Sequence, residues 1–368
     1  EWEWEQWFEV SMKPLLSRMA LAPTDGNHDD TPNLNYTYHF NTDKAFNETA
    51  TVKPQFDGIT YSFVYGDALF MVYSHQDFWR GSYSYANGTS TYLSNDVANW
   101  FRDQVEKYPD TKWRIAAVHK NLFTGSGHQT DEDGALFRAT LLPVFQELNI
   151  DFVIQGHDHI YEVMGPINNT TKTIVPGSVT NVELVSPDSN KNPKGQQGGT
   201  FNVKDGTLYF VNGTCGRKRY YPYTQDEMEA GFDKHKVEGY WDLFTGKYGQ
   251  PGAPAFSEIS VSSSEIEVKT YTSDANAQAT LFDTFKIVKN GNTGIEENKQ
   301  SAKLYPTYAK DKINTTESDI IRVNAIDLTG KIYPLPFDNQ HIDVSNLTDG
   351  IYVCLLYTSD AADEEDSV

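Results

Sequence analysis

Histidine and asparagine side chains gather at three places in the sequence, each directly after a short apolar run. Residues 22–30 read APTDGNHDD and include Asn27 and His28, His119 ends the run WRIAAVHK, and DFVIQGHDH ends with His157 and His159. Neutral imidazole is the commonest protein metal ligand, and an asparagine adds an oxygen donor. One histidine at a strand end is usually an ordinary packing residue. Several at equivalent strand ends supply enough donors for a site of two metal ions.

The cysteine count restricts what else could hold a metal. Only Cys215 and Cys354 are present, far apart in sequence, so neither a thiolate zinc cage nor a disulfide framework is expected. Any metal must therefore be held by histidine, asparagine and carboxylate groups. Two cations about 3.5–4 Å apart can neutralise phosphoryl oxygens, bind the attacking hydroxide and support in-line displacement. Mixed nitrogen and oxygen ligands suit Fe, Zn or Mn, and the ligand types alone do not choose among them.

The elements that must position these residues follow an α/β pattern. Residues 2–19 have near-helical spacing of aromatic side chains, ALAP at residues 20–23 predicts a short buried strand, and residues 61–75 predict two strands joined at Gly66-Asp67. Further along, the patterns predict helices at 93–108 and 134–149, the second kinked near Pro143, and strands at 113–118 and 152–155. Ligands of open α/β sheets bind beyond the carboxyl ends of strands, so the three loops are expected to converge.

The motifs, taken in this order, resemble a known family. GNHD at 26–29, VHK with His119, and GHDHIYE at 156–162 resemble the calcineurin-like metallophosphoesterases, and more closely their purple acid phosphatase branch. His128, nine residues past His119, fits the substrate-binding histidine of that branch. The resemblance covers roughly residues 1–290. It implies a mixed α/β fold, the metallophosphoesterase α/β/β/α sandwich, present here in part.

The resemblance assigns metal ligands position by position. It implies that Asn27, His119 and His157 ligate one metal ion, while His159 ligates the other. The cofactors implied are two divalent or trivalent metal ions.

The resemblance also assigns catalytic roles. His28 would face the phosphate and either protonate the leaving oxygen or stabilise the transition state, with Asp29 or Asp30 orienting its ring. His128 would hold the phosphate from the opposite side.

Two motifs of the family are missing from the sequence. The family places an Asp-x-His or Asp-x-Gly strand end and a Gly-Asp motif, whose aspartate bridges both metals, upstream of GNHD. Only 25 residues precede Gly26, and they contain neither motif. We interpret the sequence as truncated just after the Gly-Asp loop, and we expect the chain as given to be inactive.

The C-terminal part predicts a separate β module. We expect a metallophosphoesterase domain at 1–290, a linker at 291–312, a β-rich module at 313–353 and an adaptor-derived or disordered acidic tail at 354–368. The module resembles the C-terminal sorting domain of type IX secretion substrates, although a generic β-sandwich is the alternative. The resemblance implies export to the surface or medium of a bacterium, with the secretion machinery as partner.

Composition narrows the function classes. The formal net charge of −21 argues against a binder of nucleic-acid backbones, and no apolar run approaches the roughly 18 residues of a membrane span. The leading hypothesis is a secreted metal-dependent phosphoesterase that hydrolyses small phosphomonoesters. The same site could instead take phosphodiesters, nucleotides or pyrophosphate. A third hypothesis is a non-catalytic surface module in which the aromatic stretches 83–93 or 216–225 bind a carbohydrate or another partner.

Overall fold

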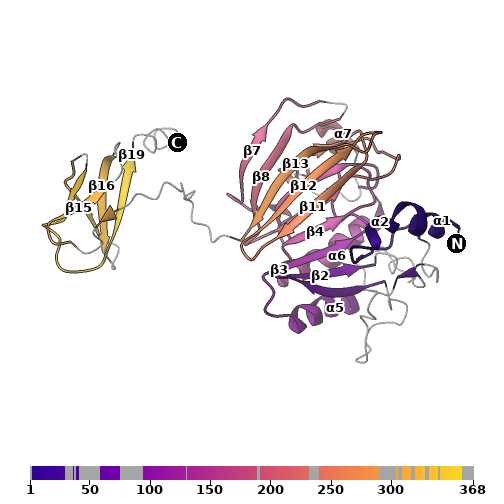
Figure 1. Ribbon diagram of the computed structural model, residues 1–368, viewed down its shortest axis with the longest axis horizontal. Helices are drawn as coiled ribbons and strands as arrows, with labels where there is room; N and C mark the ends of the chain where they lie inside the picture. The colour runs from indigo at the N-terminus through magenta and orange to yellow at the C-terminus, as the bar shows by residue number, and fades with distance from the viewer. Residues whose placement is uncertain are drawn as a thin grey trace. The chain divides into compact units, whose positions relative to one another are not determined.

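The structure is a computed structural model of the 368-residue chain. It describes residues 2–29, 36, 39–40, 59–74, 94–129, 131–188, 191–231, 240–289, 304–305, 309–315, 320–327, 331–338 and 340–358. Two compact units are present, Glu1–Asn292 and Thr293–Val368 (Figure 1).

The first unit is built on an eight-stranded sheet with the order β1-β2-β3-β4-β9-β5-β10, and β6 pairs with β5. Its strands are β1 (Tyr61–Tyr65), β2 (Ala68–Tyr73), β3 (Trp113–Val118), β4 (Phe152–Gln155), β5 (Tyr161–Asn168), β6 (Thr173–Ile174), β9 (Thr207–Asn212) and β10 (Tyr248–Gly249). Strands β2, β3, β4 and β9 are parallel neighbours, so their carboxyl ends lie along one edge. The predicted hairpin between β1 and β2 is present, with Gly66 at φ 58°.

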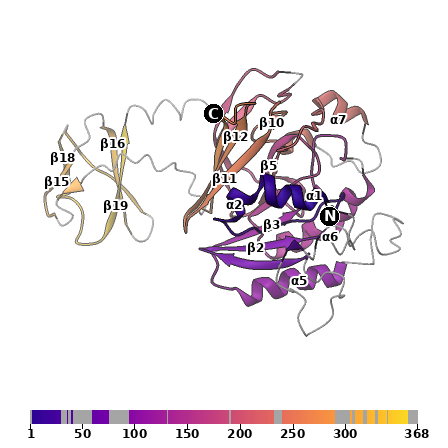
Figure 2. The same cartoon turned by 45° about the vertical axis from the view of Figure 1, so that its right-hand side comes forward.

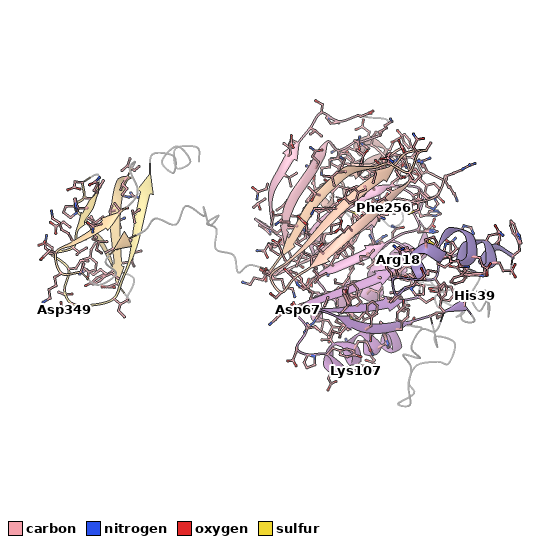
Figure 3. All side chains as sticks on the ribbon, in the orientation of Figure 1. Arg18, His39, Asp67, Lys107, Phe256 and Asp349 are labelled. Carbon is pink, nitrogen blue, oxygen red and sulfur yellow. The ribbon has the colours of Figure 1, made fainter. Side chains whose placement is uncertain are left out.

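A second sheet covers one face of the first (Figures 1 and 2). Its order is β11-β12-β13-β8-β7, formed by β7 (Val179–Leu184), β8 (Gln196–Asn202), β11 (Ala255–Val261), β12 (Glu265–Ser273) and β13 (Ala279–Val288). On its outer face, Phe256 of β11 is 43% exposed (Figure 3). All five strands of this sheet lie between residues 179 and 288 of the sequence.

Helices cover the opposite face of the first sheet. Helix α5 (Ser94–Lys107) and helix α6 (Glu132–Glu147), which contains Pro143, lie where the sequence pattern predicts helices. Two shorter elements, α7 (Gln225–Gly231) and the 3-10 helix η3 (Tyr240–Leu243), follow later in the chain. None of the helices in the described ranges is long and apolar enough to cross a membrane.

Strand β3 shows how the layers are held together. Trp113 and Ile115 point into the core between the two sheets, whereas Ala116 and Val118 belong to the core between the first sheet and the helices. Successive side chains of a strand point to opposite faces, so a strand buried on both faces reads as a continuous apolar run. The apolar run at 113–118 therefore fixes β3 in the middle of the fold.

The N-terminal segment differs from its prediction at one point. It contains α1 (Trp2–Glu5), the π-helix η1 (Gln6–Ser11) and α2 (Lys13–Leu16), as the aromatic spacing indicates. The predicted buried strand at 20–23 is wrong, because these residues pair with none of the described strands and Leu21 is 41% exposed. Pro23 has no N–H to donate to a ladder, and its carbonyl instead accepts a hydrogen bond from the Tyr61 hydroxyl at 2.7 Å.

The second unit contains two three-stranded sheets. One consists of β14 (Leu304–Tyr305), β15 (Lys312–Thr315) and β18 (His341–Asp343), and the other of β16 (Ile320–Asp327), β17 (Ile332–Pro334) and β19 (Tyr352–Thr358). Strand β14 lies within the expected linker. Strand β19 pairs with β16 as far as Thr358, past residue 353, where the tail was expected to begin. The likeness to a sorting domain, and the export that it implies, stay predictions.

Candidate functional site

Two of the three histidine loops leave the sheet side by side. His119 directly follows β3, His157 follows β4 after Gly156, and β3 and β4 are parallel neighbours. The Gly156 N–H donates to the His119 carbonyl at 2.8 Å. A Cβ on Gly156 would lie 3.3 Å from both Nδ1 and the carbonyl oxygen of His119, so glycine permits this close approach. His157 has φ 64°, an uncommon conformation for a non-glycine residue and one that is enriched at functional sites.

Three predicted ligands of one metal ion meet at His119. Its Nε2 lies 2.9 Å from Asn27 Oδ1 and 3.3 Å from His157 Nδ1. Burial, reinforced by the positive charges of Lys120 and neighbouring histidines, lowers the pKa of His119 to about 4. The imidazole is therefore neutral near pH 7, which is the form that binds metals. The structure thus brings together one oxygen and two nitrogen donors from three loops.

The GNHD loop is a tight turn held by its own carboxylate. Asp29 Oδ2 accepts the Gly26 N–H at 2.6 Å, and burial raises the pKa of Asp29. The buried Asp25 accepts a hydrogen bond from the Ser74 hydroxyl at 2.7 Å, which ties the loop to the end of β2. His28 is exposed at the tip of the turn. Its orientation by Asp29 stays a prediction, and Asp30 lies outside the described residues.

His128 lies against the donor cluster. The centroids of the His128 and His157 rings are 3.8 Å apart, and His128 Nδ1 lies 2.8 Å from Asp131 Oδ2. Ligand atoms of His128, Asp131 and His157 all lie within 4.8 Å of one another, so this trio could itself hold a metal ion. The H-x-x-D spacing of His128 and Asp131, just before α6, was the sequence signal for this partner.

His159 is oriented by a loop that motif analysis did not connect with the site. Its Nδ1–H can donate to the Lys218 carbonyl at 2.9 Å, which leaves Nε2 available for a metal. The His159 ring stacks on Tyr220 with centroids 4.7 Å apart, and the Tyr220 hydroxyl lies 3.5 Å from His128 Nε2. Partial burial lowers the pKa of His159. The stretch 216–225, considered above only for a carbohydrate or partner, thus contacts both histidines. The stretch 83–93 lies outside the described residues.

Two buried carboxyl groups lie beneath the histidines and were missed by motif analysis. Asp158 and Glu162 have no exposed surface, and both contact the hydroxyl of Thr124, Asp158 at 2.5 Å and Glu162 at 2.8 Å. The available signal was an aspartate and a glutamate in GHDHIYE, between the apolar residues of two strands, where a charged side chain is costly to bury.

Comparison with known proteins gives one family match and three related sequences. Residues 1–161 match the calcineurin-like phosphoesterase family. Uncharacterized proteins from two Mycobacterium tuberculosis strains are 26% identical over 186 residues, and purple acid phosphatase 5 of Arabidopsis thaliana is 26% identical over 176 residues. Each of these alignments covers 47% of this chain and 34% of the relative, so the chain spans about a third of the length of the relatives that it matches.

Among solved structures, the chain is similar to the purple acid phosphatase PPD1 from yellow lupin seeds. The TM-score is 0.38 with 16% identity, covering 66% of this chain and 34% of the lupin chain. The family match over residues 1–161, together with the sheets described above, confirms the predicted mixed α/β metallophosphoesterase fold. Truncation and the sorting domain stay predictions.

Proposed function

Starting from the match of residues 1–161 to the calcineurin-like phosphoesterase family, we propose that this chain is a metal-dependent phosphoesterase acting on phosphomonoesters. The observation that carries the proposal is the convergence of three possible metal ligands. His119 Nε2 lies 2.9 Å from Asn27 Oδ1 and 3.3 Å from His157 Nδ1. These atoms come from loops that are distant in sequence. Such convergence is expected of a ligand set and is not needed to hold the sheet together.

The donor chemistry fits the metals that the family implies. A carbonyl oxygen and neutral imidazole nitrogens suit Fe, Zn or Mn, and the lowered pKa of His119 keeps its lone pair available. Asn27, His119 and His157 would hold one ion, and His159, oriented by the Lys218 carbonyl, would serve a second. When bound, such ions neutralise phosphoryl charge and lower the pKa of a bound water.

The remaining side chains would act on the substrate directly. His128 contacts Asp131 and has its ring beside that of His157, and it would donate a hydrogen bond to a phosphoryl oxygen. His28 is exposed at the tip of its turn, where it could reach a leaving-group oxygen and protonate it. The two histidines would thus act from different loops on the same phosphoryl group.

Metal binding by defined variants tests the proposal. Purified chain is dialysed against Mn²⁺ or Zn²⁺, and bound metal is measured by elemental analysis for the wild type and for Asn27→Ala, His157→Ala and the control His341→Ala, which lies in the second unit. We expect binding by the wild type and the control, and a loss in both site variants. Equal metal content in all four proteins would refute the proposed ligand set.

Substrate class is tested in parallel with metal-loaded chain. Initial rates on an aryl phosphomonoester are compared with rates on an aryl phosphodiester, a nucleotide and pyrophosphate. Preferential, chelator-sensitive release of phosphate from the monoester supports the proposal, whereas preference for another substrate favours the alternative use of the same site. Brisk turnover of the monoester would also overturn the expectation that the chain as given is inactive.

A further inference from the structure

The hydroxyl of Thr124 lies between two carboxyl groups in the interior of the first unit. Thr124 Oγ1 is 2.5 Å from Asp158 Oδ2 and 2.8 Å from Glu162 Oε1, and all three side chains are at most 2% exposed. Thr124 belongs to the loop that leads to His128, Asp158 lies between His157 and His159, and Glu162 lies in β5. The contacts therefore join the loop of His128 to the loop of the predicted metal ligands.

Counting hydrogens favours one protonated carboxyl group in this network. A threonine hydroxyl has a single hydrogen and can donate it to only one of the two carboxyl oxygens. The second short contact is a hydrogen bond only if that carboxyl group supplies a hydrogen of its own. Two ionised carboxylates on one hydroxyl would also repel each other in a region without solvent.

The surroundings favour Glu162 as the protonated group. Within the described part of the chain, Glu162 has no ion-pair partner, and the ionisable groups that face it are Asp158, Tyr240 and Tyr248. Burial raises the pKa of Glu162 well above its ordinary value, and the charge of Asp158 adds to this effect. The Thr124 hydroxyl lies closer to Asp158 Oδ2, at 2.5 Å, than to Glu162 Oε1, at 2.8 Å, as expected if the hydroxyl donates to an Asp158 carboxylate. Asp158 is also the carboxyl group nearer to His128, with its Oδ1 4.0 Å from Nε2.

The remaining hydrogen bonds indicate which group donates and which accepts along the series Glu162, Thr124 and Asp158. Glu162 Oε2 accepts the Gly125 N–H at 2.9 Å, so a proton on this side chain belongs on Oε1, which faces Thr124. We propose that Glu162 is a carboxylic acid at neutral pH that donates to Thr124, which in turn donates to the Asp158 carboxylate, and that Glu162 is thereby a positioning residue for His128. The network then carries one negative charge, on the carboxylate nearest to His128.

This arrangement holds the His128 loop without placing a second charge under the site. Gly125 is bound through its N–H by Glu162, and its carbonyl accepts a hydrogen bond from the Tyr248 hydroxyl at 2.5 Å. Tyr248 and Glu162 are directly opposite each other on β10 and β5. The effect on substrate rests on the function proposed for His128, whereas the protonation of Glu162 does not.

Glu162→Gln is the variant that separates the two protonation states. A glutamine carbonyl can accept from Gly125 while its amide N–H donates to Thr124, which reproduces the hydrogen bonds of the carboxylic acid. It cannot reproduce those of an ionised glutamate, which accepts at both oxygens. Glu162→Ala removes both bonds, and Glu267→Gln, at an exposed ion pair with Lys269, is the matched control.

Infrared spectroscopy and unfolding test the protonation. At neutral pH we expect a carboxylic-acid C=O band in the wild type and in Glu267→Gln that is absent from Glu162→Gln. Above about pH 5 the Glu162 carboxyl group loses its proton in the unfolded wild type but keeps it in the folded protein. The unfolding equilibrium constant of the wild type should therefore rise about tenfold per pH unit relative to that of Glu162→Gln. The proposal would be overturned if the wild type showed no carboxylic-acid band. It would also be overturned if the unfolding constants of the wild type and Glu162→Gln had the same pH dependence while Glu162→Gln was destabilised.

Binding of inorganic phosphate to Mn²⁺-loaded protein tests the positioning role. We expect Glu162→Gln to bind phosphate within about twofold of the wild type. Glu162→Ala loses both hydrogen bonds to the His128 loop and should bind at least about tenfold more weakly, because a single lost hydrogen bond already corresponds to a change of about that size. Equal binding by all variants would overturn the positioning role. Absence of phosphate binding by the wild type would refute the function proposed for His128, and with it the positioning role, while the infrared band and the unfolding data still decide the protonation of Glu162.

Discussion

Replacing His119 with glutamine should remove much of the acid sensitivity of the metal-free first unit. In the folded chain burial lowers the pKa of His119 from its ordinary 6.5 to about 4, so the unfolded chain binds a proton that the folded chain does not. Stability contributed by the neutral imidazole is therefore present above about pH 6.5 and is lost as the pH falls toward 4. Glutamine is neutral at both ends of this range and removes the effect.

The expected magnitude follows from the difference between the two pKa values. At about 1.36 kcal/mol per pH unit, the change from 6.5 to about 4 corresponds to roughly 3 kcal/mol. A loss of this size is a large fraction of the stability of an ordinary domain. The wild type should therefore lose roughly 3 kcal/mol more than His119→Gln between about pH 7 and pH 4.

Urea unfolding followed by tryptophan fluorescence can measure this difference. All seven tryptophans lie before residue 242, so the signal reports on the first unit alone. The protein is first treated with chelator, because a bound metal would compete with the proton for His119. His28→Gln, at the exposed tip of the neighbouring turn, controls for the loss of one imidazole. Parallel pH dependences for the wild type and His119→Gln would refute the reasoning.

Two further predictions concern packing and surface charge. Gly125→Ala should destabilise the first unit by about 1–3 kcal/mol in urea unfolding, because the new Cβ would lie 2.5 Å from the Tyr248 hydroxyl. Gly127→Ala should destabilise it much less, because a Cβ at that position has no atom within 4 Å. Equal losses of stability in the two variants would contradict this prediction. Arg102 and Glu147 join α5 to α6 on the surface, so a double-mutant cycle should give a small coupling energy that weakens with added salt. A large coupling that does not change with salt would contradict the prediction.

Local sequence patterns were sufficient for much of the fold. The apolar runs at 113–118 and 152–155 became β3 and β4, and Gly66 between two alternating runs became the turn of a hairpin. These features depend on side-chain periodicity and on backbone conformations that a glycine permits, both of which are local properties. The strand predicted at residues 20–23 is absent, because a strand also needs a neighbouring strand to pair with, and the apolar residues of ALAP do not specify one.

The candidate site, too, was predicted from the sequence only in part. The sequence by itself determined which residues could bind a metal and that His119 and His157 follow strands. Only the tertiary structure decided that β3 and β4 are neighbours, that His119 Nε2 lies 2.9 Å from Asn27, and that residues 216–225 contact His128 and His159. It alone also joined Thr124 to Asp158 and Glu162. The physical reason is that donor type and strand propensity belong to single residues and short segments, whereas a distance between loops depends on strand order and on packing across the whole sheet.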